Sequence, residues 1–315
     1  MTVLPVSAIR DAAARIAPHV LRTPLLRSPR LDARFGATLL FKAECLQVTG
    51  SFKIRGATNA VLRLPDGTPG VVAYSSGNHA QAVALAASRA EMPAVIVMPA
   101  DAPAAKRERT AAYGAEARLY DRQAESREAI GGAIAAERGY ALVLPYDHPD
   151  TMAGQGTAGL EAAEDAAALG LAPDLVLVCC SGGGLAAGVG TAVRARFPAC
   201  EVVTVEPEGF DDTARSLAAG RRVANEAGTS SVCDALLVAT PGARTFPVLQ
   251  SLGARGVAVS DAEALRAVRL AAEELRVVLE PGGAVALAAV ASGRVEVAGR
   301  TVLVVLSGGN ADLPT

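Results

Sequence analysis

Three glycine-containing segments each follow an apolar run that predicts a β-strand. They are Ser75-Ser76-Gly77-Asn78-His79, Ser181-Gly182-Gly183-Gly184-Leu185 and Ser307-Gly308-Gly309-Asn310. Where such a turn leads from a parallel strand into a helix, the first backbone N–H groups of the helix lie bare at the carboxyl edge of the sheet and bind anions. Three turns of this kind in one chain therefore predict anion binding at a sheet edge.

The second of these segments also fits a dinucleotide-binding fingerprint. Gly182, Gly184 and Ala187 read as G-x-G-x-x-A after a strand, and Glu206 ends the next strand about 20 residues later. A nicotinamide-dependent dehydrogenase is therefore an alternative, although it gives the other two turns no role. The sequence contains no G-x-x-x-x-G-K-[ST], so a Walker A site is excluded.

Lys53 lies near the start of a predicted helix, in the segment Gly50–Ala57. A lysine in a helix is normally a solvated surface residue. If Lys53 is instead desolvated, close to the helix N-terminus and to Arg55, its pKa falls and the free amine becomes a nucleophile or base at neutral pH. Lys53 is therefore a candidate catalytic residue.

The elements that must position these residues follow an alternation of strands and helices, which is typical of βαβ units on a parallel sheet. The predicted strands are Thr38–Phe41, Val71–Tyr74, Ala94–Met98, Ala117–Tyr120, Leu142–Leu144, Leu175–Cys179, Val202–Val205 and Thr301–Leu306. We expect Ser7 and Ser51 to cap two of the helices, and Asp261 to precede a third over Glu263–Leu275.

Two turn-rich breaks, Leu64–Gly70 and Tyr146–Asp150, bracket a part of the chain that has its own strand–helix alternation. We therefore predict a smaller inserted α/β domain over residues 66–147. Residues 1–65 and 148–315 then form the large domain.

The composition limits the class of protein. The chain has 315 residues, 51% of them hydrophobic, with 30 Lys+Arg against 32 Asp+Glu and a net charge of −2. Balanced charge without long basic runs excludes the electrostatic footprint of a nucleic-acid or anionic-membrane binder. No apolar run approaches the roughly 18–20 residues that span a bilayer. We therefore expect a small-molecule partner.

Two features concern the cellular compartment. The N-terminal segment lacks the charged, apolar and small-residue order of a signal peptide. The five cysteines form no C-x-x-C pair, so we expect reduced and mostly buried thiols. Both observations predict a cytoplasmic protein.

Five ordered motifs together resemble the threonine/serine dehydratase and serine racemase family. They are SFKIRGA at 51–57, SSGNHAQAVA at 75–84, SGGGLAAG at 181–188, EPGGA at 280–284 and LSGGN at 306–310. The resemblance extends from about Thr23 to Asn310. It implies a two-domain, fold-type II enzyme of the tryptophan synthase β-like kind that depends on pyridoxal 5′-phosphate (PLP). In that α/β fold, each domain is a mostly parallel twisted sheet flanked by helices.

The resemblance also implies an ammonia-lyase reaction. A small β-hydroxy amino acid, by default L-threonine or L-serine, undergoes α,β-elimination to a 2-oxo acid and ammonia. Lys53 would hold PLP as an internal Schiff base and then take the Cα proton. The implied cofactor contacts are Phe52 beside the ring, Asn78 at the 3-oxygen, Ser307 at the pyridine nitrogen, and Ser181, Gly182, Gly183, Gly184 and Leu185 at the phosphate. Ser181 departs from the usual four glycines of this loop.

The substrate contacts implied by the resemblance lie in two segments. The substrate carboxylate is assigned to Ser75, Ser76, Gly77, Asn78 and His79. Ser76 matches a residue that reprotonates the carbanion in racemases of the family, so catalysis by Ser76 and serine racemisation remain open. Arg127 resembles an arginine that approaches an anionic substrate group in racemases and 3-hydroxyaspartate dehydratases. The other interpretation of Arg127 is a solvated helix face.

The acidic segment at 206–212 resembles a divalent-cation site of the family. By position the ligands are Glu206, Asp212 and the Phe210 carbonyl, hard oxygen donors that suit Mg²⁺ or Ca²⁺. An acidic loop without a metal is the alternative. The resemblance further implies a homodimer. Outside PLP chemistry, the dehydrogenase and a catalytically silent metabolite-binding protein, which would not need Lys53, are the alternatives to the enzyme.

Overall fold

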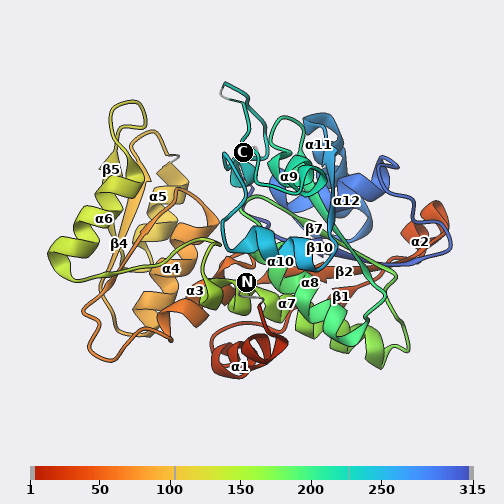
Figure 1. Cartoon of the computed structure of the whole chain (residues 1–315), viewed down its shortest axis with the longest axis horizontal. Coiled ribbons are helices and arrows are strands. Elements are labelled where there is room, and N and C mark those ends of the chain that lie inside the picture. Colours follow the sequence, from red (N-terminus) through yellow and green to blue (C-terminus); the bar gives the residue numbers. More distant parts are fainter. Residues whose placement is uncertain (1–3, 103, 227, 312–315) are drawn as a thin grey trace.

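The computed structural model describes residues 4–102, 104–226 and 228–311. The chain forms two separate β-sheets, and helices alternate with their strands along the sequence. Figure 1 shows the smaller sheet at the left and the larger one at the right. The strand pairings in the two sheets are parallel, except for one antiparallel pairing at an edge of the larger sheet. The predicted α/β class with mostly parallel sheets is confirmed.

The larger sheet has six strands. Their order is β1 (Leu25–Leu26), β2 (Thr38–Ala43), β10 (Thr301–Leu306), β7 (Leu175–Cys179), β8 (Glu201–Pro207) and β9 (Arg255–Val259). Only β1 is antiparallel to its neighbour. The strands β7 and β10 are nearly continuous apolar runs, as expected where helices cover both faces of a parallel sheet.

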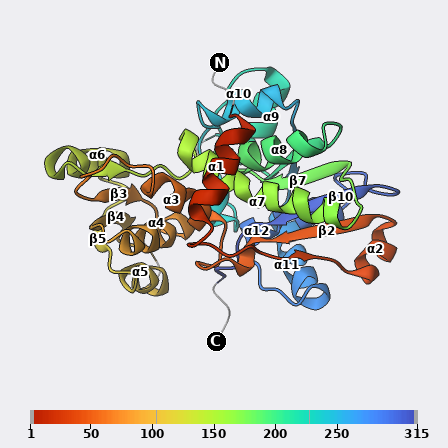
Figure 2. The same ribbon diagram turned by 90° about the horizontal axis from the view of Figure 1, so that it is seen from below.

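Helices cover both faces of the larger sheet. Figure 2 shows α7 (Pro149–Ala168) and α8 (Gly184–Arg196) on one side, and α11 (Asp261–Glu274) and α12 (Pro281–Ala291) on the other. The remaining elements of this part are α1 (Val6–Ile16), α2 (Pro29–Phe35), α9 (Asp212–Ala219), α10 (Thr245–Ser251) and the 3₁₀ turns η1 (Glu44–Leu46) and η2 (Asp234–Leu236).

The smaller sheet has four strands, ordered β5 (Glu116–Tyr120), β4 (Ala94–Pro99), β3 (Val71–Tyr74) and β6 (Ala141–Leu142). Alternate residues of β3 face opposite sides, since Val71 and Ala73 belong to one apolar cluster and Val72 to another. The helices α3 (Lys53–Val61) and α4 (Asn78–Arg89) contribute to the first cluster, and α6 (Arg127–Arg138) to the second. Helix α5 (Ala104–Ala111) contacts α4 and β5.

Glycines in α7 set how closely its neighbours approach. A Cβ at Gly154 would lie 2.4 Å from the Arg55 carbonyl oxygen of α3, and one at Gly159 would lie 2.7 Å from Cα of Val189 in α8. Real side chains do not tolerate such distances, so both contacts depend on glycine. The helix that begins at Lys53 is thereby held against the larger half of the molecule.

Several local predictions were wrong. Ser7 lies inside α1, whose N-cap is Pro5, and Ser51 does not cap α3, whose N-cap is Phe52. Ser260, rather than Asp261, caps α11 through a capping box with Glu263. Strand β6 occupies Ala141–Leu142 instead of Leu142–Leu144.

Two strands were not predicted. Strand β1 has only two residues, and β9 is a partly exposed edge strand with a glycine in it, so neither carries a strong apolar pattern. All five cysteines are buried and free, as expected. None of the helices in the described ranges has the length and hydropathy of a membrane-spanning segment.

Candidate active site

The three glycine-containing turns meet in one cleft of about 490 Å³. They follow β3, β7 and β10, so each lies at the carboxyl end of a parallel strand, where open α/β sheets bind ligands. All predicted catalytic, cofactor and substrate residues line this cleft: Phe52, Lys53, Ser75, Ser76, Gly77, Asn78, His79, Arg127, Ser181, Gly182, Gly183, Gly184, Leu185 and Ser307. The structure thus places them together, while their individual roles stay predictions.

Lys53 projects from the first position of α3 into the cleft. Its Nζ donates a hydrogen bond of 2.9 Å to the Pro145 carbonyl and lies 5.0 Å from the centroid of the Phe52 ring. Burial lowers the pKa of Lys53 to about 8, although Cys179 and Glu280 nearby raise it. A neutral amine is therefore accessible close to neutral pH, as nucleophilic or basic chemistry requires.

Backbone contacts fix the start of α3 against the larger sheet. The Phe52 N–H donates to the Ser307 carbonyl at 3.1 Å, and Ser51 forms an isolated bridge with Gly308. The Pro145 carbonyl that holds Lys53 also accepts a hydrogen bond of 3.1 Å from Gln155 Nε2. The lysine is therefore held by contacts to β10 and α7.

The glycine loop between β7 and α8 is shaped for close approach of a ligand. A Cβ at Gly182 would lie 2.3 Å from the Tyr146 ring, and one at Gly184 would lie 2.5 Å from Gln155 Oε1. Gly183 has a φ of 90°, which favours glycine, and no side chain caps α8. The first N–H groups of α8 are therefore available to an anion such as a phosphate.

Two hydrogen-bonded groups of side chains also line the cleft. The Cys179 thiol donates to Ser307 Oγ at 3.1 Å. Asn78 donates through Nδ2 to Glu280 Oε1 at 2.6 Å and accepts at Oδ1 from Asn310 Nδ2 at 2.7 Å. Burial raises the pKa of Cys179 to about 11, so it is a neutral donor.

The turn before α4 presents polar groups to the cleft. Gly77 is the N-cap of α4, without a side-chain cap, and Ser75 Oγ accepts the Gly77 N–H at 3.2 Å. Ser76 lines the cleft beside them. Backbone N–H groups and hydroxyls in this arrangement are suited to a carboxylate.

His79 is the most buried member of this segment, with 3% of its surface exposed. Its Nε2 lies 2.9 Å from the Val143 carbonyl, so a neutral ring donates there. Burial, together with the charge of Lys53, lowers the pKa of His79 to about 3. The ring therefore stays neutral and ties α4 to the segment that leads to Pro145.

This histidine predicts acid sensitivity. Below its ordinary pKa of 6.5, the unfolded chain takes up a proton that the folded chain excludes down to about pH 3, so the unfolding free energy falls as the pH falls. One such group contributes up to about 1.4 kcal/mol per pH unit. His79→Gln should flatten this dependence in urea titrations between pH 7 and 5, with His148→Gln as the control. An unchanged slope in His79→Gln would contradict the assignment.

Three arginines line the cleft: Arg122, Arg127 and Arg222. Arg127 pairs with Glu128 at 2.8 Å and lies over the Tyr74 ring, with 47% of its side chain exposed. Arg122 pairs with Asp101 at 2.8 Å. Arg222 donates from Nε to the Pro241 carbonyl at 2.7 Å and pairs with no carboxylate in the described ranges.

The predicted cation ligands lie outside this cleft, at the junction of β8 and α9. Glu206 is fully buried, and its carboxylate accepts the N–H groups of Thr213 at 3.0 Å and Ala214 at 2.8 Å. Because Glu206 is buried and does not line the cleft beside the glycine loop, the dehydrogenase alternative loses its acidic residue.

The two carboxylates at this junction have raised pKa values. Burial raises the pKa of Asp212 to about 6, and burial and the Asp212 charge raise that of Glu206. Asp212 Oδ1 accepts from Asn225 Nδ2 at 2.6 Å, whereas the buried Oδ2 has no hydrogen-bond partner. Within the ranges that the structure describes, no group of three or more His, Cys, Asp or Glu side chains is placed to hold a metal.

Several residues of the cleft were not predicted from the sequence. Tyr146 and Asp147 were interpreted only as a turn, yet Tyr146 faces the glycine loop and Asp147 accepts the N–H groups of residues 243–245. Cys179, Glu280 and Asn310 were also missed as site residues, although the EPGGA and LSGGN motifs contain two of them. Their positions could have identified them, because Cys179 ends β7, Glu280 is the N-cap of α12 and Asn310 lies in the turn after β10.

Comparison with known proteins agrees with this geometry. A family described as "Pyridoxal-phosphate dependent enzyme" matches residues 16–308. The L-threo-3-hydroxyaspartate ammonia-lyase of Saccharomyces cerevisiae is 41% identical over 307 residues, which cover 97% of this chain and 93% of the relative. The serine racemase of Oryza sativa subsp. indica is 40% identical over 315 residues, covering 98% and 91%.

A solved structure has the same fold over the whole length. A threonine deaminase from T.th. aligns with a TM-score of 0.92 and 44% sequence identity, covering 99% of this chain and 100% of that one. The similarity therefore includes both sheets and every segment of the cleft. With a family match over nearly the whole sequence and relatives at 40% identity or above, the chain belongs to the pyridoxal-phosphate-dependent enzymes of fold type II, in the family of dehydratases and racemases.

Proposed function

We propose that this enzyme is an ammonia-lyase whose preferred substrate is L-threo-3-hydroxyaspartate, which it converts to oxaloacetate and ammonia. The observation that carries the proposal is that three arginines line the cleft, above all Arg222, which has no carboxylate partner within the described ranges. L-Threonine and L-serine have no second carboxylate that could pair with Arg222. The yeast relative named for hydroxyaspartate supports the same choice.

The charges in the cleft favour a dicarboxylic substrate. Arg127 and Arg122 already face carboxylates, so each is partly neutralised, whereas Arg222 is bonded only to a carbonyl. A guanidinium that meets a substrate carboxylate forms charge-assisted hydrogen bonds, which are the strong ones. The α-carboxylate would bind at the N-terminus of α4, which leaves Arg222 and Arg127 for the β-carboxylate.

The cleft fits PLP, because the uncapped N-terminus of α8 suits its phosphate and Lys53 lies within the same cavity. When bound, PLP supplies the electron sink that makes the Cα proton acidic. The Lys53 amine is the base for that proton, and its lowered pKa makes the neutral amine accessible near neutral pH. Ser307 accepts the Cys179 hydrogen, so its own hydroxyl hydrogen remains for the ring nitrogen.

The stoichiometry of the reaction follows from the substrate. Loss of the Cα proton and the β-hydroxyl removes water, and hydrolysis of the resulting imino acid returns water and releases ammonia. Ser76, which also lines the cleft, is the candidate proton donor for the competing racemisation. Elimination and racemisation can therefore compete at the same site.

The test compares L-threo-3-hydroxyaspartate, L-serine and L-threonine on the purified holoenzyme, with 2-oxo acid and ammonia as products. We expect the highest kcat/KM for hydroxyaspartate. Arg222→Gln should lower that value by about ten-fold or more and leave L-serine turnover nearly unchanged, since one charged hydrogen bond is worth at least this much. Arg118→Gln, at an exposed pair outside the cleft, is the control.

Two results would overturn the proposed substrate. A higher kcat/KM for L-threonine or L-serine than for hydroxyaspartate would return the preference to the small monocarboxylic substrates. Interconversion of L- and D-serine faster than any elimination would make the enzyme a racemase. Equal losses for all three substrates in Arg222→Gln would remove Arg222 from substrate selection.

We also infer that Glu206, Asp212 and the Phe210 carbonyl bind Mg²⁺ or Ca²⁺. The buried, unpartnered Oδ2 of Asp212 supports this site, because a cation would satisfy it and offset the repulsion from Glu206. Saturating cation should raise the unfolding temperature, and binding at about 100 times the dissociation constant corresponds to about 2.7 kcal/mol. Asp212→Asn should lose this increase, while Asp211→Asn keeps it. An equal increase in both variants would contradict the site.

A further inference from the structure

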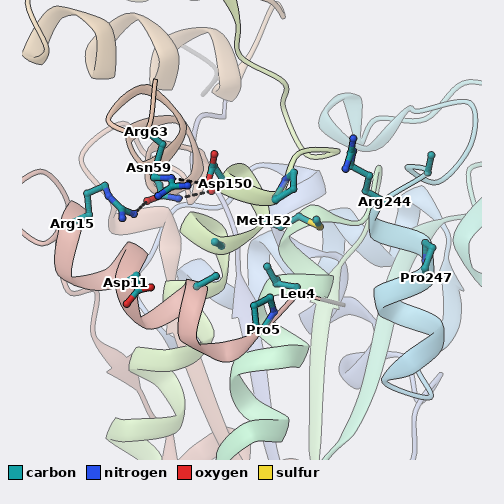
Figure 3. Close-up of a pocket in the computed structure, with 14 residues that line it drawn as sticks. Leu4, Pro5, Asp11, Arg15, Asn59, Arg63, Asp150, Met152, Arg244 and Pro247 are labelled. Carbon is teal, nitrogen blue, oxygen red and sulfur yellow. Dashed lines mark hydrogen bonds and ion pairs between the residues drawn. The ribbon is translucent and has the colours of Figure 1, made fainter. Parts of the chain in front are cut away.

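A second cavity, of about 330 Å³, shares no lining residue with the active-site cleft. It is called the α1 cavity here because α1 forms one wall; the others come from α3, the start of α7 and the segment around α10 (Figure 3). Its size is at the lower end of the range for small-molecule pockets, roughly 300–1,000 Å³. None of the residues assigned to the reaction lines it.

The floor of the α1 cavity is apolar. It is formed by Leu4, Pro5, Ala8, Met152, Ala153, Ala243 and Pro247. Met152 is buried and adaptable in shape, so it can accommodate different apolar groups. This part of the cavity favours a hydrocarbon body over an extended polar ligand.

The rim of the α1 cavity carries charge. Three arginines, Arg15, Arg63 and Arg244, face two aspartates, Asp11 and Asp150, which gives a net charge of +1. Arg63 is paired with Asp150 at 3.2 Å, and Arg15 donates to the neutral Asn59 amide at 2.7 Å. The side chains of Arg244 and Asp11 have no hydrogen bond or ion pair within the described ranges, and Figure 3 shows them on opposite sides of the cavity.

We propose that the α1 cavity binds a small carboxylate with an apolar body. The carboxylate meets Arg244 or Arg15, neither of which is neutralised by a carboxylate within the described ranges, and the body lies on the apolar floor. Figure 3 shows the open carboxylate of Asp11 on the same side of the cavity as Arg15, where it adds a place for an ammonium group, so an apolar amino acid would use these two charges. Oxo acids and fatty acids of similar length share the first part of this chemistry.

The position of the α1 cavity connects it to the active-site cleft. Asn59 and Arg63 lie at the end of the helix that begins at Lys53, and Asn59 Nδ2 also donates to the Asp150 carbonyl at 2.7 Å. The backbone N–H of Arg244 donates to Asp147 Oδ1 at 2.8 Å, and Asp147 lines the active-site cleft. A ligand in the cavity thus contacts both elements that place Lys53, and we expect binding to slow hydrogen exchange in residues 144–153.

The binding test uses hexanoate and its uncharged isostere hexanamide in calorimetric titrations of the holoenzyme. We expect saturable binding of one hexanoate per chain and about ten-fold weaker binding of hexanamide, because the amide lacks the charged hydrogen bond. Binding is measured directly, so the result does not depend on which amino acid the enzyme converts. No saturable binding of hexanoate or norleucine to the folded holoenzyme would overturn the proposal.

Matched variants place the ligand. Arg244→Gln or Arg15→Gln, whichever of the two arginines meets the carboxylate, should weaken hexanoate binding by about ten-fold, and Ala8→Phe should abolish it by filling the cavity. The controls on the same helix α1, Arg10→Gln and Ala14→Phe, change exposed positions outside the cavity and should bind normally. The melting temperature of each variant shows whether it is folded.

Two further variants decide between sites and ligands. If Arg222→Gln weakens hexanoate binding and neither Arg244→Gln nor Arg15→Gln does, the anion binds in the active-site cleft and the proposal is wrong. Comparing norleucine with hexanoate shows whether the ligand is an amino acid or a simple carboxylate. Asp11→Asn should weaken norleucine alone if the ligand is an amino acid. Equal effects on both ligands remove Asp11 from recognition and leave a simple carboxylate.

Discussion

The Lys53→Ala variant is expected to lose at least about 10⁴-fold in kcat, the upper part of the range for removing one positioned base. The variant removes the base for the Cα proton and the only amine among the residues that line the cleft in the described ranges. We expect the fold to persist, because the hydrogen bond that the Lys53 side chain makes is one to the Pro145 carbonyl. PLP should still bind at α8, but without a covalent bond to the protein.

The measurement is borohydride reduction of the holoenzyme, followed by mass analysis of the peptide that carries residue 53. The wild type should retain the cofactor mass on Lys53 and the variant should not. Lys53→Arg keeps the positive charge without a nucleophilic amine, so it should be as inactive as the alanine variant. A variant that keeps full ammonia-lyase activity would remove Lys53 from catalysis. A wild type that carries no adduct would favour the silent metabolite-binding alternative.

The strands around the cleft could be predicted because burial on both faces requires a clear apolar pattern. In a parallel sheet covered on both faces, each strand is an apolar run, and Leu175–Cys179 and Thr301–Leu306 show this in the sequence. Each run ends at a glycine-containing turn, so the order of the motifs also predicts which residues meet. The two missed strands are a two-residue edge and a strand with a glycine in it, where local pattern carries little information.

The helix starts were harder to predict, for a physical reason. Ser51 is fully buried in a bridge with Gly308, so tertiary contacts, rather than a side-chain cap, decide where α3 begins. The same contacts place Lys53 in the cleft. A capping rule considers only neighbours in sequence. It fails where the residues before a helix are hydrogen-bonded to the backbone of a segment distant in sequence, as Ser51 and Phe52 are here.

Residues that act through long-range contacts could not be predicted. Cys179 and Glu280 became relevant only when the fold placed them beside Ser307 and Asn78. Their spacing in sequence has no bearing on those distances. Quaternary state and compartment likewise stay predictions, a homodimer in the cytoplasm, because the structure holds one chain.

Arg55→Met should lower the unfolding free energy by about 3–5 kcal/mol, the cost of breaking a buried ion pair from one side. Arg55 is fully buried and donates to both oxygens of Glu44, at 2.7 and 2.9 Å. It also donates to both oxygens of Glu161, which Lys42 contacts at 2.6 Å. Two cations and two anions thus neutralise each other in the core, two residues after Lys53.

Urea unfolding of the variant and of Arg138→Gln provides the comparison. Arg138 forms an exposed pair with Glu116, so its loss should change the unfolding free energy little. The double variant Arg55→Met/Glu44→Met should be more stable than Arg55→Met, because it leaves no lone charge at position 44. If the single variant unfolds like Arg138→Gln, the buried network contributes little to stability.

The pH dependence identifies the charge that causes the loss. Burial alone would raise the pKa of Glu44, but the charge and hydrogen bonds of Arg55 lower it below its ordinary value of 4.5. In the wild type Glu44 therefore adds stability above that pH and loses it as the pH falls. Without Arg55, burial dominates and the folded chain favours a protonated Glu44. The difference in unfolding free energy between wild type and Arg55→Met should therefore shrink from pH 7 to about pH 4, whereas a simple loss of packing would leave it constant.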